Sequence, residues 1–396
     1  MKPTTMKWID ALAGVPLCFL ASPLAVLYRV VRPPPRLESN PPDTILFIKL
    51  LGMGSIILTT PTVKAMGSRF PGARRDLLTF AANKPVADAL GVFDAVHVLR
   101  TKNFFVLSFD TLRFLGKIWC RRYAIVMDFE FFSKFSALLS FLTLAPHRTG
   151  FSSPLVWRGW LQTEPVLFNH YRHITDNFLG HAKVLGVQAT DKTLAALRSG
   201  PDDQRVVDQL LCGKGVPAEA PLFLVNVNAS DMCLERRWPI TSFDQLLSAL
   251  KARYPKVWFL LVGAPSERSY VQQVIATLKD SARIVDLAGC LSLPQLADLM
   301  KRSRLLITSE SGPLHFAQSL DVPSVTLFGP GPPTLFGPLG QKHRTLYAAV
   351  DCSPCLNYYA LTGPTCGGDN ICMKYILPAD VERVIQEHLE HLRAAV

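Results

Sequence analysis

The stretch Thr44-Ile45-Leu46-Phe47-Ile48-Lys49-Leu50-Leu51-Gly52-Met53-Gly54-Ser55 predicts a buried strand that runs directly into a glycine turn, followed by a helix over residues 56–69. Its continuous apolar character is typical of a parallel strand that is covered on both faces. Gly52 and Gly54 can adopt backbone angles that other residues avoid, and they let a ligand approach the backbone closely. The helix that follows presents N–H groups that suit a phosphate or another anion. A plain strand–helix corner is the alternative interpretation of such a turn.

Strands and helices alternate along the rest of the chain. The first half predicts strands at 44–50, 76–80, 95–99 and 123–128, with helices at 56–69, 83–90 and 104–120. The second half predicts strands at 222–228, 257–262, 283–287, 304–308 and 323–328, with helices at 241–253, 266–279, 294–302 and 312–320. Strands separated by helices indicate parallel βαβ units. We therefore expect an α/β protein with two doubly wound, Rossmann-like domains that face a cleft lined by strand-end loops.

The domain limits follow from length and composition. A chain of 396 residues is too long for one ordinary core, and the polar region 188–220, with scattered Gly and Pro, marks the boundary between the domains. The predicted parts are a hydrophobic N-terminal segment, a first Rossmann-like domain, a second Rossmann-like domain and a C-terminal helix, at residues 1–36, 43–195, 205–378 and 379–396.

The N-terminal segment contains an apolar run, residues 11–31, that is followed by arginines and a proline-rich linker. A helix of this length would measure about 30 Å, one hydrocarbon thickness of a bilayer. The run predicts membrane attachment, either across the bilayer or in its interface, and a helix packed on the protein body is the alternative. No small-residue cleavage site suggests a removed signal peptide.

The formal net charge is +11, which favours anionic lipid or phosphorylated substrates as partners. Nucleic acid is disfavoured, because the chain has no zinc finger, no aromatic RNA-binding motif and no long basic run.

Two carboxylates lie at the end of the strand predicted at 123–128. Asp128 ends that strand and Glu130 lies two residues further on, at the same sheet edge as the glycine turn. Either side chain could act as a general base, and we expect Asp128 to reach the rim of the cleft. The alternative is that one of them caps the helix that begins near Ser133.

In the second half, a loop after the first strand suits a diphosphate. Asn228 and Ser230 offer amide and hydroxyl groups, and Arg236 and Arg237 follow with guanidinium groups. A solvated basic turn is the alternative. Glu267 follows the next strand, where it could bind ribose hydroxyls.

A second anion-binding loop is predicted after the strand at 304–308. Glu310, Ser311 and Gly312 form a turn that opens a helix, and His315 lies in the first turn of that helix. A lone histidine is more often structural, although one beside a strand-end anion loop is less easily dismissed.

Four of the nine cysteines have the spacing C-x2-C-x10-C-x5-C: Cys352, Cys355, Cys366 and Cys372. Four thiolates at this spacing could hold a structural zinc ion, and reduced or paired cysteines are the alternative.

The ordered set of these segments resembles glycosyltransferase family 9, the heptosyltransferases of bacterial lipopolysaccharide assembly. The matching pieces run from about residue 43 to residue 378 and comprise the glycine turn, Arg236-Arg237-Trp238-Pro239, Gly263 to Glu267, Leu287-Ala288-Gly289, Ser311-Gly312-Pro313-Leu314-His315 and Leu327-Phe328-Gly329-Pro330. The resemblance implies a GT-B fold and an inverting transfer from a nucleotide-activated sugar, typically ADP-heptose, with no cofactor required.

The resemblance also implies roles for residues. The first domain would bind the acceptor and the second the donor, with Ser230 and Arg236 at the diphosphate, Glu267 at the ribose, and the turn Glu310–His315 at the sugar and phosphate. Many family members have an aspartate directly after the glycine turn as the proposed base, but Ser55 stands here. Glu310 stands where the family usually has aspartate. Asp128 or Glu130 is therefore our replacement candidate for the base.

The resemblance further implies a lipid-linked glycan or lipopolysaccharide core as acceptor. It places the enzyme at the cytoplasmic face of a bacterial inner membrane, as a peripheral or single-anchor protein on an anionic surface. The rival hypothesis is a non-catalytic sugar-nucleotide binder or scaffold, which the missing aspartate favours. A dehydrogenase is disfavoured, because no complete G-x-G-x-x-G with a following acidic strand end is present.

Overall fold

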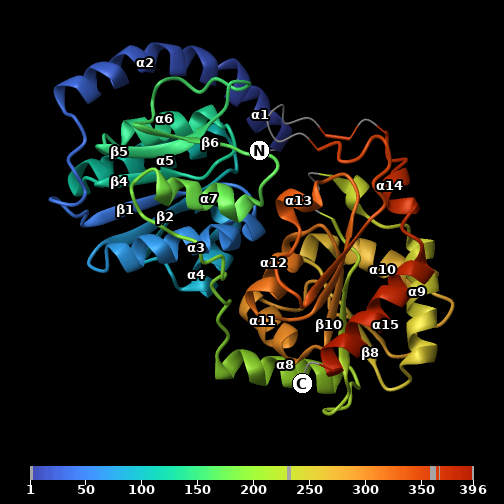
Figure 1. The fold of residues 1–396 in the computed structure, drawn as a ribbon. Helices are drawn as coiled ribbons and strands as arrows, with labels where there is room; N and C mark the ends of the chain where they lie inside the picture. The colour runs from blue at the N-terminus through green and yellow to red at the C-terminus, as the bar shows by residue number, and fades with distance from the viewer. Residues whose placement is uncertain (1–2, 230–232, 357–362, 365, 395–396) are drawn as a thin grey trace. The chain divides into compact units, whose positions relative to one another are not determined.

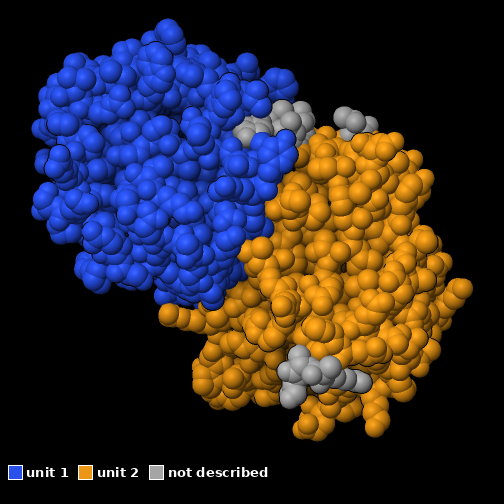
Figure 2. All heavy atoms as spheres, in the orientation of Figure 1, with its two compact units in different colours: residues 1–195, 358–360 blue, residues 196–357, 361–396 orange. Residues whose placement is uncertain are grey.

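The computed structural model describes residues 3–229, 233–356, 363–364 and 366–394 (Figure 1). The chain forms two compact units, the first ending at Ala195 and the second beginning at Ala196 (Figure 2). Each unit contains one sheet of six parallel strands with helices on it.

The sheet of the first unit has the strand order β3-β2-β1-β4-β5-β6. Its strands are β1 (Thr44–Ile48), β2 (Arg74–Phe80), β3 (Ala95–Leu99), β4 (Ile125–Asp128), β5 (His147–Ser152) and β6 (Glu164–Leu167). Its helices are α1 (Pro3–Leu12), α2 (Gly14–Val31), α3 (Met53–Arg69), α4 (Lys84–Leu90), α5 (Phe104–Arg121), α6 (Lys134–Leu142) and α7 (Ile174–Lys183). Because the order reverses after β3 and crossovers are right-handed, α3 and α4 cover one face while α5 and α6 cover the other (Figure 1).

The sheet of the second unit has the order β12-β11-β10-β7-β8-β9, which repeats that of the first unit when it is read from β9. Its strands are β7 (Leu222–Asn226), β8 (Trp258–Leu261), β9 (Ile284–Asp286), β10 (Leu305–Ser309), β11 (Ser324–Phe328) and β12 (His343–Tyr347). Its helices are α8 (Pro201–Gly213), α9 (Ile240–Arg253), α10 (Arg268–Thr277), α11 (Leu293–Arg302), α12 (Gly312–Ser319), α13 (Pro333–Phe336), α14 (Ile371–Lys374) and α15 (Pro378–Ala394).

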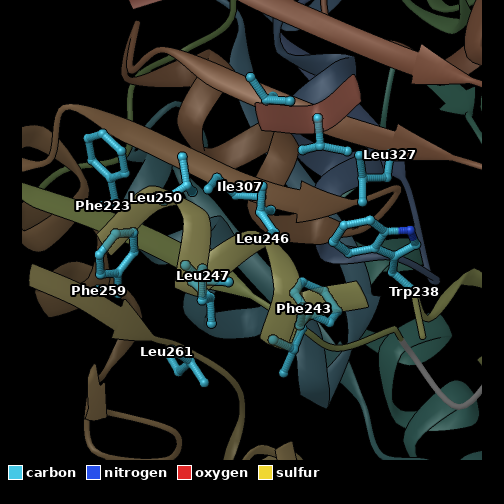
Figure 3. Packing of buried hydrophobic residues seen from close by; sticks show 14 of the residues in the cluster. Phe223, Trp238, Phe243, Leu246, Leu247, Leu250, Phe259, Leu261, Ile307 and Leu327 are labelled. Carbon is cyan, nitrogen blue, oxygen red and sulfur yellow. The ribbon is translucent and has the colours of Figure 1, made fainter. Parts of the chain in front are cut away.

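Both sheets have a topological switch point, where ligands of open α/β sheets bind beyond the carboxyl ends of the strands. In the first unit it lies between β1 and β4, and in the second between β7 and β10. The core beneath the second switch point is built around Trp238, whose ring packs on Phe243 at 5.0 Å between centroids (Figure 3). The indole nitrogen of Trp238 donates a hydrogen bond of 3.0 Å to the carbonyl of Ile376.

The prediction of an α/β protein with two doubly wound domains is confirmed. β5, β6 and β12 were not predicted from the sequence, and α8 lies in the region that was predicted to be a polar domain boundary. β5 and β12 contain His, Arg and Thr, and β6 contains a proline, so their sequences lack the apolar run of an inner strand. β6 and β12 are edge strands, where proline and polar residues are tolerated.

The predicted N-terminal helix is present as α2, but it is not a separate appendage. Its small residues Gly14, Cys18, Ser22 and Ala25 are buried, and the helix packs on α6 of the first unit. Cys18 and Ala25 form a hydrophobic cluster with side chains of α6 and of the β5–β6 loop. Among the described residues, α2 is the one helix that is long and apolar enough to cross a membrane.

Candidate functional site

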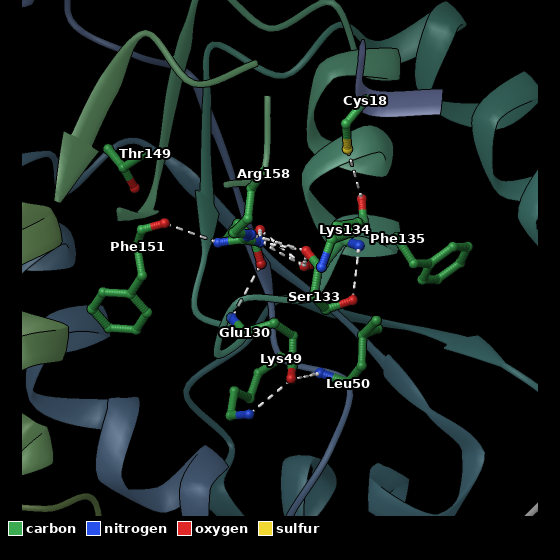
Figure 4. Close-up of polar contacts among 12 residues, drawn as sticks. Cys18, Lys49, Leu50, Glu130, Ser133, Lys134, Phe135, Thr149, Phe151 and Arg158 are labelled. Atoms are coloured by element: carbon green, nitrogen blue, oxygen red, sulfur yellow. Dashed lines mark hydrogen bonds and ion pairs between the residues drawn. The ribbon is translucent and has the colours of Figure 1, made fainter. Parts of the chain in front are cut away.

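Glu130 and Lys49 form a buried ion pair at the switch point of the first unit (Figure 4). The carboxylate oxygen Oε1 of Glu130 lies 2.7 Å from Lys49 Nζ, and it also accepts backbone N–H groups from Leu50 at 2.6 Å and Leu51 at 3.0 Å. These contacts hold the chain where it leaves β1 for the glycine turn. Gly52 has a φ of 86°, a value that favours glycine, so the sequence expectation for this turn is met.

Asp128 does not reach a solvent-exposed rim, contrary to expectation. Its side chain is fully buried, and its carboxylate contacts the guanidinium of Arg158, Ser136 Oγ at 2.9 Å and the backbone N–H of Glu130 at 3.1 Å. Burial raises the pKa of Asp128, and the charge of Arg158 opposes that rise. Arg158 also donates to the carbonyls of Ser133 and Phe151 (Figure 4). The aspartate is therefore half of an internal ion pair.

The expected alternative, that Asp128 or Glu130 caps the next helix, is wrong. Ser133 is the N-cap of α6, and its hydroxyl accepts the N–H of Ser136. Asp10 of α1 adds to this cap, because its carboxylate accepts the N–H groups of Lys134 at 3.1 Å and Phe135 at 2.7 Å.

Ser55 lies half-buried in the first turn of α3. A Cβ added at Gly52 would meet Ser55 Oγ at 3.0 Å, so the serine hydroxyl stands directly against the turn. The N-cap of α3 is Gly52, which makes no side-chain cap hydrogen bond, so the helix presents backbone N–H groups at this edge. Gly54 is buried within the same turn.

In the second unit, Glu310 follows β10 and pairs with Arg236. The Nε of Arg236 lies 2.9 Å from Glu310 Oε1, which also accepts the N–H of Gly331 at 2.9 Å. Burial raises the pKa of Glu310 to about 7, and the nearby guanidinium of Arg236 limits that rise. The pair thus places a cation and a carboxyl group that is partly protonated at neutral pH beside the second switch point.

The raised pKa predicts a pH effect on stability that Glu310→Gln should remove. An unfolded glutamate has its ordinary pKa near 4.5, whereas the folded carboxyl holds its proton to about pH 7. Between these values the folded state binds more protons, so stability falls as the pH rises and the loss is complete above about 7. The expected loss is about 3 kcal/mol relative to the variant. Urea unfolding at the two ends of the window checks it, and a difference between the proteins that is constant with pH would contradict it.

A polar network joins β7 to the turn that opens α12. Asn226 Nδ2 donates to Thr308 Oγ1 at 3.0 Å and to Ser311 Oγ at 2.9 Å. Two buried oxygens nearby, Asn228 Oδ1 and Ser309 Oγ, have no hydrogen-bond partner within the described chain. Buried polar atoms are rarely left unpaired in native proteins. They lie after β7 and at the end of β10, where a bound ligand would donate hydrogen bonds to them.

Glu267 lies close to this network. Its Oε2 accepts the N–H of Ala264 at 2.7 Å, and a Cβ added at Gly263 would meet Glu267 Oε2 at 3.2 Å and Asn228 Nδ2 at 2.7 Å. Asn228 and Glu267 therefore flank the glycine that follows β8. Ser311 is the N-cap of α12, Gly312 is its first residue, and His315 is buried three positions later. The structure thus brings most of the predicted donor-binding residues to one sheet edge.

Arg237, in contrast, does not join Arg236. Its guanidinium stacks on the ring of Tyr270, with 3.7 Å between the guanidinium carbon and the ring centroid. Both side chains line a separate hollow of about 480 Å³ that is also lined by Trp238, Asn370 and Lys374. Ser230, the other residue predicted at the diphosphate, lies outside the described residues.

The structure gives no support to the zinc hypothesis for Cys352, Cys355, Cys366 and Cys372. Within the described ranges, no group of three or more His, Cys, Asp or Glu side chains could hold a metal ion. Burial raises the pKa of the Cys372 thiol to about 11 and also raises that of Cys355. Cys352 and Cys366 are exposed.

Two residues of the site were missed by sequence reasoning. Arg158 lies in an aromatic stretch, and nothing in its spacing relates it to Asp128. Gly331 follows a glycine–proline turn, and a Cβ there would clash with the carboxylate of Glu310. A glycine after the Leu327-Phe328-Gly329-Pro330 segment was the available signal.

Comparison with known proteins places these features in context. A family model described as glycosyltransferase family 9 (heptosyltransferase) matches residues 113–365, more than half of the chain. Lipopolysaccharide heptosyltransferase 2 of Salmonella typhimurium is 25% identical over 314 residues, which covers 76% of this chain and 87% of that protein.

Two solved structures share the fold. The glycosyl transferase family 9 protein of Veillonella parvula has a TM-score of 0.72 at 22% identity, covering 88% of this chain and 97% of its own. The E. coli ADP-heptose lipopolysaccharide heptosyltransferase II has a TM-score of 0.70 at 18% identity, covering 88% and 99%. At these identities the structures establish the similarity of fold.

Proposed function

The chain belongs to glycosyltransferase family 9, and from this premise we propose that it transfers a sugar, heptose or a related sugar, from a nucleoside-diphosphate sugar to a lipid-linked glycan or lipopolysaccharide core. ADP-heptose or a close analogue is the proposed donor. The observation that carries the proposal is the switch point of the second unit, where the Arg236–Glu310 pair lies in the same region as the incompletely bonded Asn228 and Ser309.

The donor is proposed to bind the second unit through its diphosphate and its ribose. Arg236 supplies a guanidinium for the diphosphate. The N-terminus of α12, with Ser311, Gly312 and His315, supplies N–H groups and a favourable dipole for phosphate oxygens and the sugar. Glu267 and Asn228 offer a carboxylate and an amide oxygen to ribose hydroxyls.

The acceptor is proposed to bind the first unit, where a base must take its hydroxyl proton. We assign this role to Glu130. Both carboxylates are buried and ion-paired, but that of Glu130 contacts the backbone N–H groups of Leu50 and Leu51 at the glycine turn, whereas that of Asp128 is enclosed by Arg158 and Ser136. The acceptor oxygen attacks the anomeric carbon, the bond from that carbon to the diphosphate breaks, and the proton passes to Glu130. Attack from the side opposite the leaving group inverts the anomeric centre.

No cofactor is required in this proposal. The departing diphosphate gains negative charge, which Arg236 and the N–H groups of α12 are positioned to stabilise. We also propose that the enzyme works at the cytoplasmic face of a bacterial inner membrane, where lipid-linked acceptors are held and where residues 1–36 attach it.

Arg236→Gln is expected to weaken donor binding by about tenfold to a hundredfold, because a charge-assisted hydrogen bond contributes about 1.5–3 kcal/mol. Calorimetry of the full chain with ADP-heptose and a panel of other nucleotide sugars measures this effect. Arg253→Gln is the matched control, since Arg253 is an exposed arginine of α9 that pairs with Glu382.

Four outcomes would contradict parts of the proposal. If no nucleotide sugar binds, or if Arg236→Gln binds as tightly as the wild type, the donor site is wrong. If binding occurs but no glycolipid acceptor supports turnover, the scaffold hypothesis is favoured. If a chelator stops turnover and Mg²⁺ restores it, the cofactor-free mechanism fails.

A further inference from the structure

The helix α2 has an unusual distribution of side chains for a surface helix. Its buried residues are the small ones at positions 14, 18, 22 and 25, which let it approach α6 closely. Its large apolar residues point away from the unit and are exposed: Val15, Leu17, Phe19, Leu20, Leu24, Leu27, Val30 and Val31. A surface helix in water normally shows the opposite pattern.

α2 is bound to the first unit along its whole length. Just before it, Asp10 caps α6, and at its middle Ser22 Oγ accepts the N–H of Trp160 at 3.0 Å. Near its end, the hydroxyl of Tyr28 donates to the carbonyl of Leu144 at 2.9 Å. The helix therefore lies against the body of the unit, as Figure 1 shows.

The helix α5 carries a second exposed apolar stripe. Its inner residues, among them Phe114 and Ile118, pack in the core, yet its outward side also bears Phe105, Phe109, Leu112 and Trp119. These outward positions follow the spacing of one helical face. Phe105 alone leaves 82% of its surface exposed. A helix that is apolar on both sides is normally covered on both sides.

The two stripes belong to one side of the first unit. α5 and α6 cover the same face of the sheet, and α2 packs on the outside of α6. The indole of Trp119 donates to the carbonyl of Leu142 at the end of α6, which joins α5 to that helix. The β5–β6 loop extends the surface, because its Trp157 contacts Phe19 at 6.5 Å between ring centroids.

The exposed charges on these three segments are all positive. Residues 11–36 and the β5–β6 loop contain no acidic residue, and the one acidic residue of α5, Asp110, is buried and paired with Arg100. The exposed basic side chains are Arg29, Arg32 and Arg36 of residues 11–36 and Arg113, Lys117 and Arg121 of α5. Basic residues at an interface attract anionic lipid by about 1 kcal/mol each.

We propose that α2, α5 and the β5–β6 loop form one lipid-docking surface, with which the first unit lies on an anionic bilayer. In this arrangement α2 rests in the interface plane and does not cross the bilayer. Large apolar side chains enter the acyl boundary, tryptophans lie at the headgroup level, and basic side chains contact anionic headgroups. This inference rests on the proposed function in one respect: docking would bring the enzyme to an acceptor that is held in the membrane.

A spanning orientation conflicts with the contacts of α2. To cross the bilayer, α2 would have to leave α6 and break the hydrogen bonds of Ser22 and Tyr28, and α1 before it would lose the bonds of Asp10 to the first turn of α6. If the unit followed α2 into the bilayer intact, the irregular β5–β6 loop would enter hydrocarbon, where exposed backbone groups cannot be satisfied.

Vesicle flotation of the full chain tests the surface. We expect binding to phosphatidylcholine vesicles that contain phosphatidylglycerol, and weaker binding to pure phosphatidylcholine or at high salt. The double variant Phe105→Glu/Leu112→Glu should lose about tenfold or more of this binding. Tyr375→Glu/Leu377→Glu, which places the same two charges at exposed hydrophobic positions of the second unit, is the matched control and should bind normally.

The orientation of α2 is tested by an N-terminal epitope tag in inverted inner-membrane vesicles. An in-plane helix leaves the tag on the cytoplasmic side with the body of the protein, so added protease removes it. A protected tag would show that α2 spans the bilayer and would overturn the in-plane orientation.

Three further results would overturn the docking surface. The first is that the α5 variant floats as well as the wild type, and the second is that flotation does not depend on the lipid charge. The third is that the wild-type protein forms a stable dimer without lipid and does not float, and that the α5 variant dissociates this dimer. Binding of ADP-heptose is measured on the same preparations. A protein that docks as expected but binds no nucleotide sugar would refute the proposed function and leave the docking surface standing.

Discussion

Glu130→Gln is expected to lower turnover by about a hundredfold or more, the usual effect of removing a general base. Binding of the nucleotide sugar should stay near normal, because the residues proposed to bind it belong to the second unit. The measurement is ADP release from ADP-heptose in the presence of a truncated lipopolysaccharide, together with calorimetry of donor binding. Ser55→Ala should cost much less, since a serine hydroxyl is not a base at neutral pH.

The buried ion pair complicates this test, because glutamine at position 130 leaves the ammonium of Lys49 without its carboxylate. The double variant Lys49→Met/Glu130→Gln removes both charges while roughly preserving shape. If Glu130 serves only to neutralise Lys49, the double variant should recover turnover. If Glu130 is the base, the double variant should regain thermal stability but remain inactive. Near-normal turnover of the single variant would show that the assignment is wrong.

The sequence predicted the inner strands well because their physical signal is local. β1, β7 and β10 each contain a continuous apolar run of three or four residues, and a strand buried on both faces is typically built on such a run. β5 lacks such a local signal. Its Arg148 is buried because carbonyls of Ala145 and Leu161 accept from its guanidinium, a solution that depends on tertiary contacts.

In the candidate site, too, some positions follow from the local sequence and others depend on tertiary contacts. The sequence could place strand-end residues such as Asn228 and Glu267 near one another, because parallel strands bring their carboxyl ends to one edge of a sheet. The separation of Arg236 from Arg237 could not be foreseen, since it depends on the turn Leu234–Arg236, which directs adjacent side chains to Glu310 and to Tyr270.

The composition of α2 did not decide between a helix in the membrane and a helix packed on the protein body. The order of its residues, however, indicates the second. Gly14, Cys18, Ser22 and Ala25 recur at helical spacing and form a narrow face of small residues. Such a face indicates close contact with another helix of the protein. Mean hydropathy over the whole segment conceals this pattern, because the large residues around it dominate the average.

Asp128→Asn is expected to destabilise the first unit by about 3–5 kcal/mol, the cost of removing one partner from a buried ion pair. The guanidinium of Arg158 is itself buried, and asparagine would leave its charge without compensation. Urea unfolding of the variant measures the effect. Asp202→Asn is the control, because the pair of Asp202 with Arg205 is exposed and should contribute at most about 1 kcal/mol.

The same variant separates a structural role from a catalytic one. If Asp128 is half of an ion pair, Asp128→Asn/Arg158→Met should regain much of the lost stability, since the uncompensated charge is gone. At a temperature where Asp128→Asn remains folded, its turnover should then stay within about tenfold of the wild type. Normal unfolding of Asp128→Asn, with donor binding intact and turnover reduced by about a hundredfold or more, would make Asp128 the base and reduce Glu130 to a support for the glycine turn.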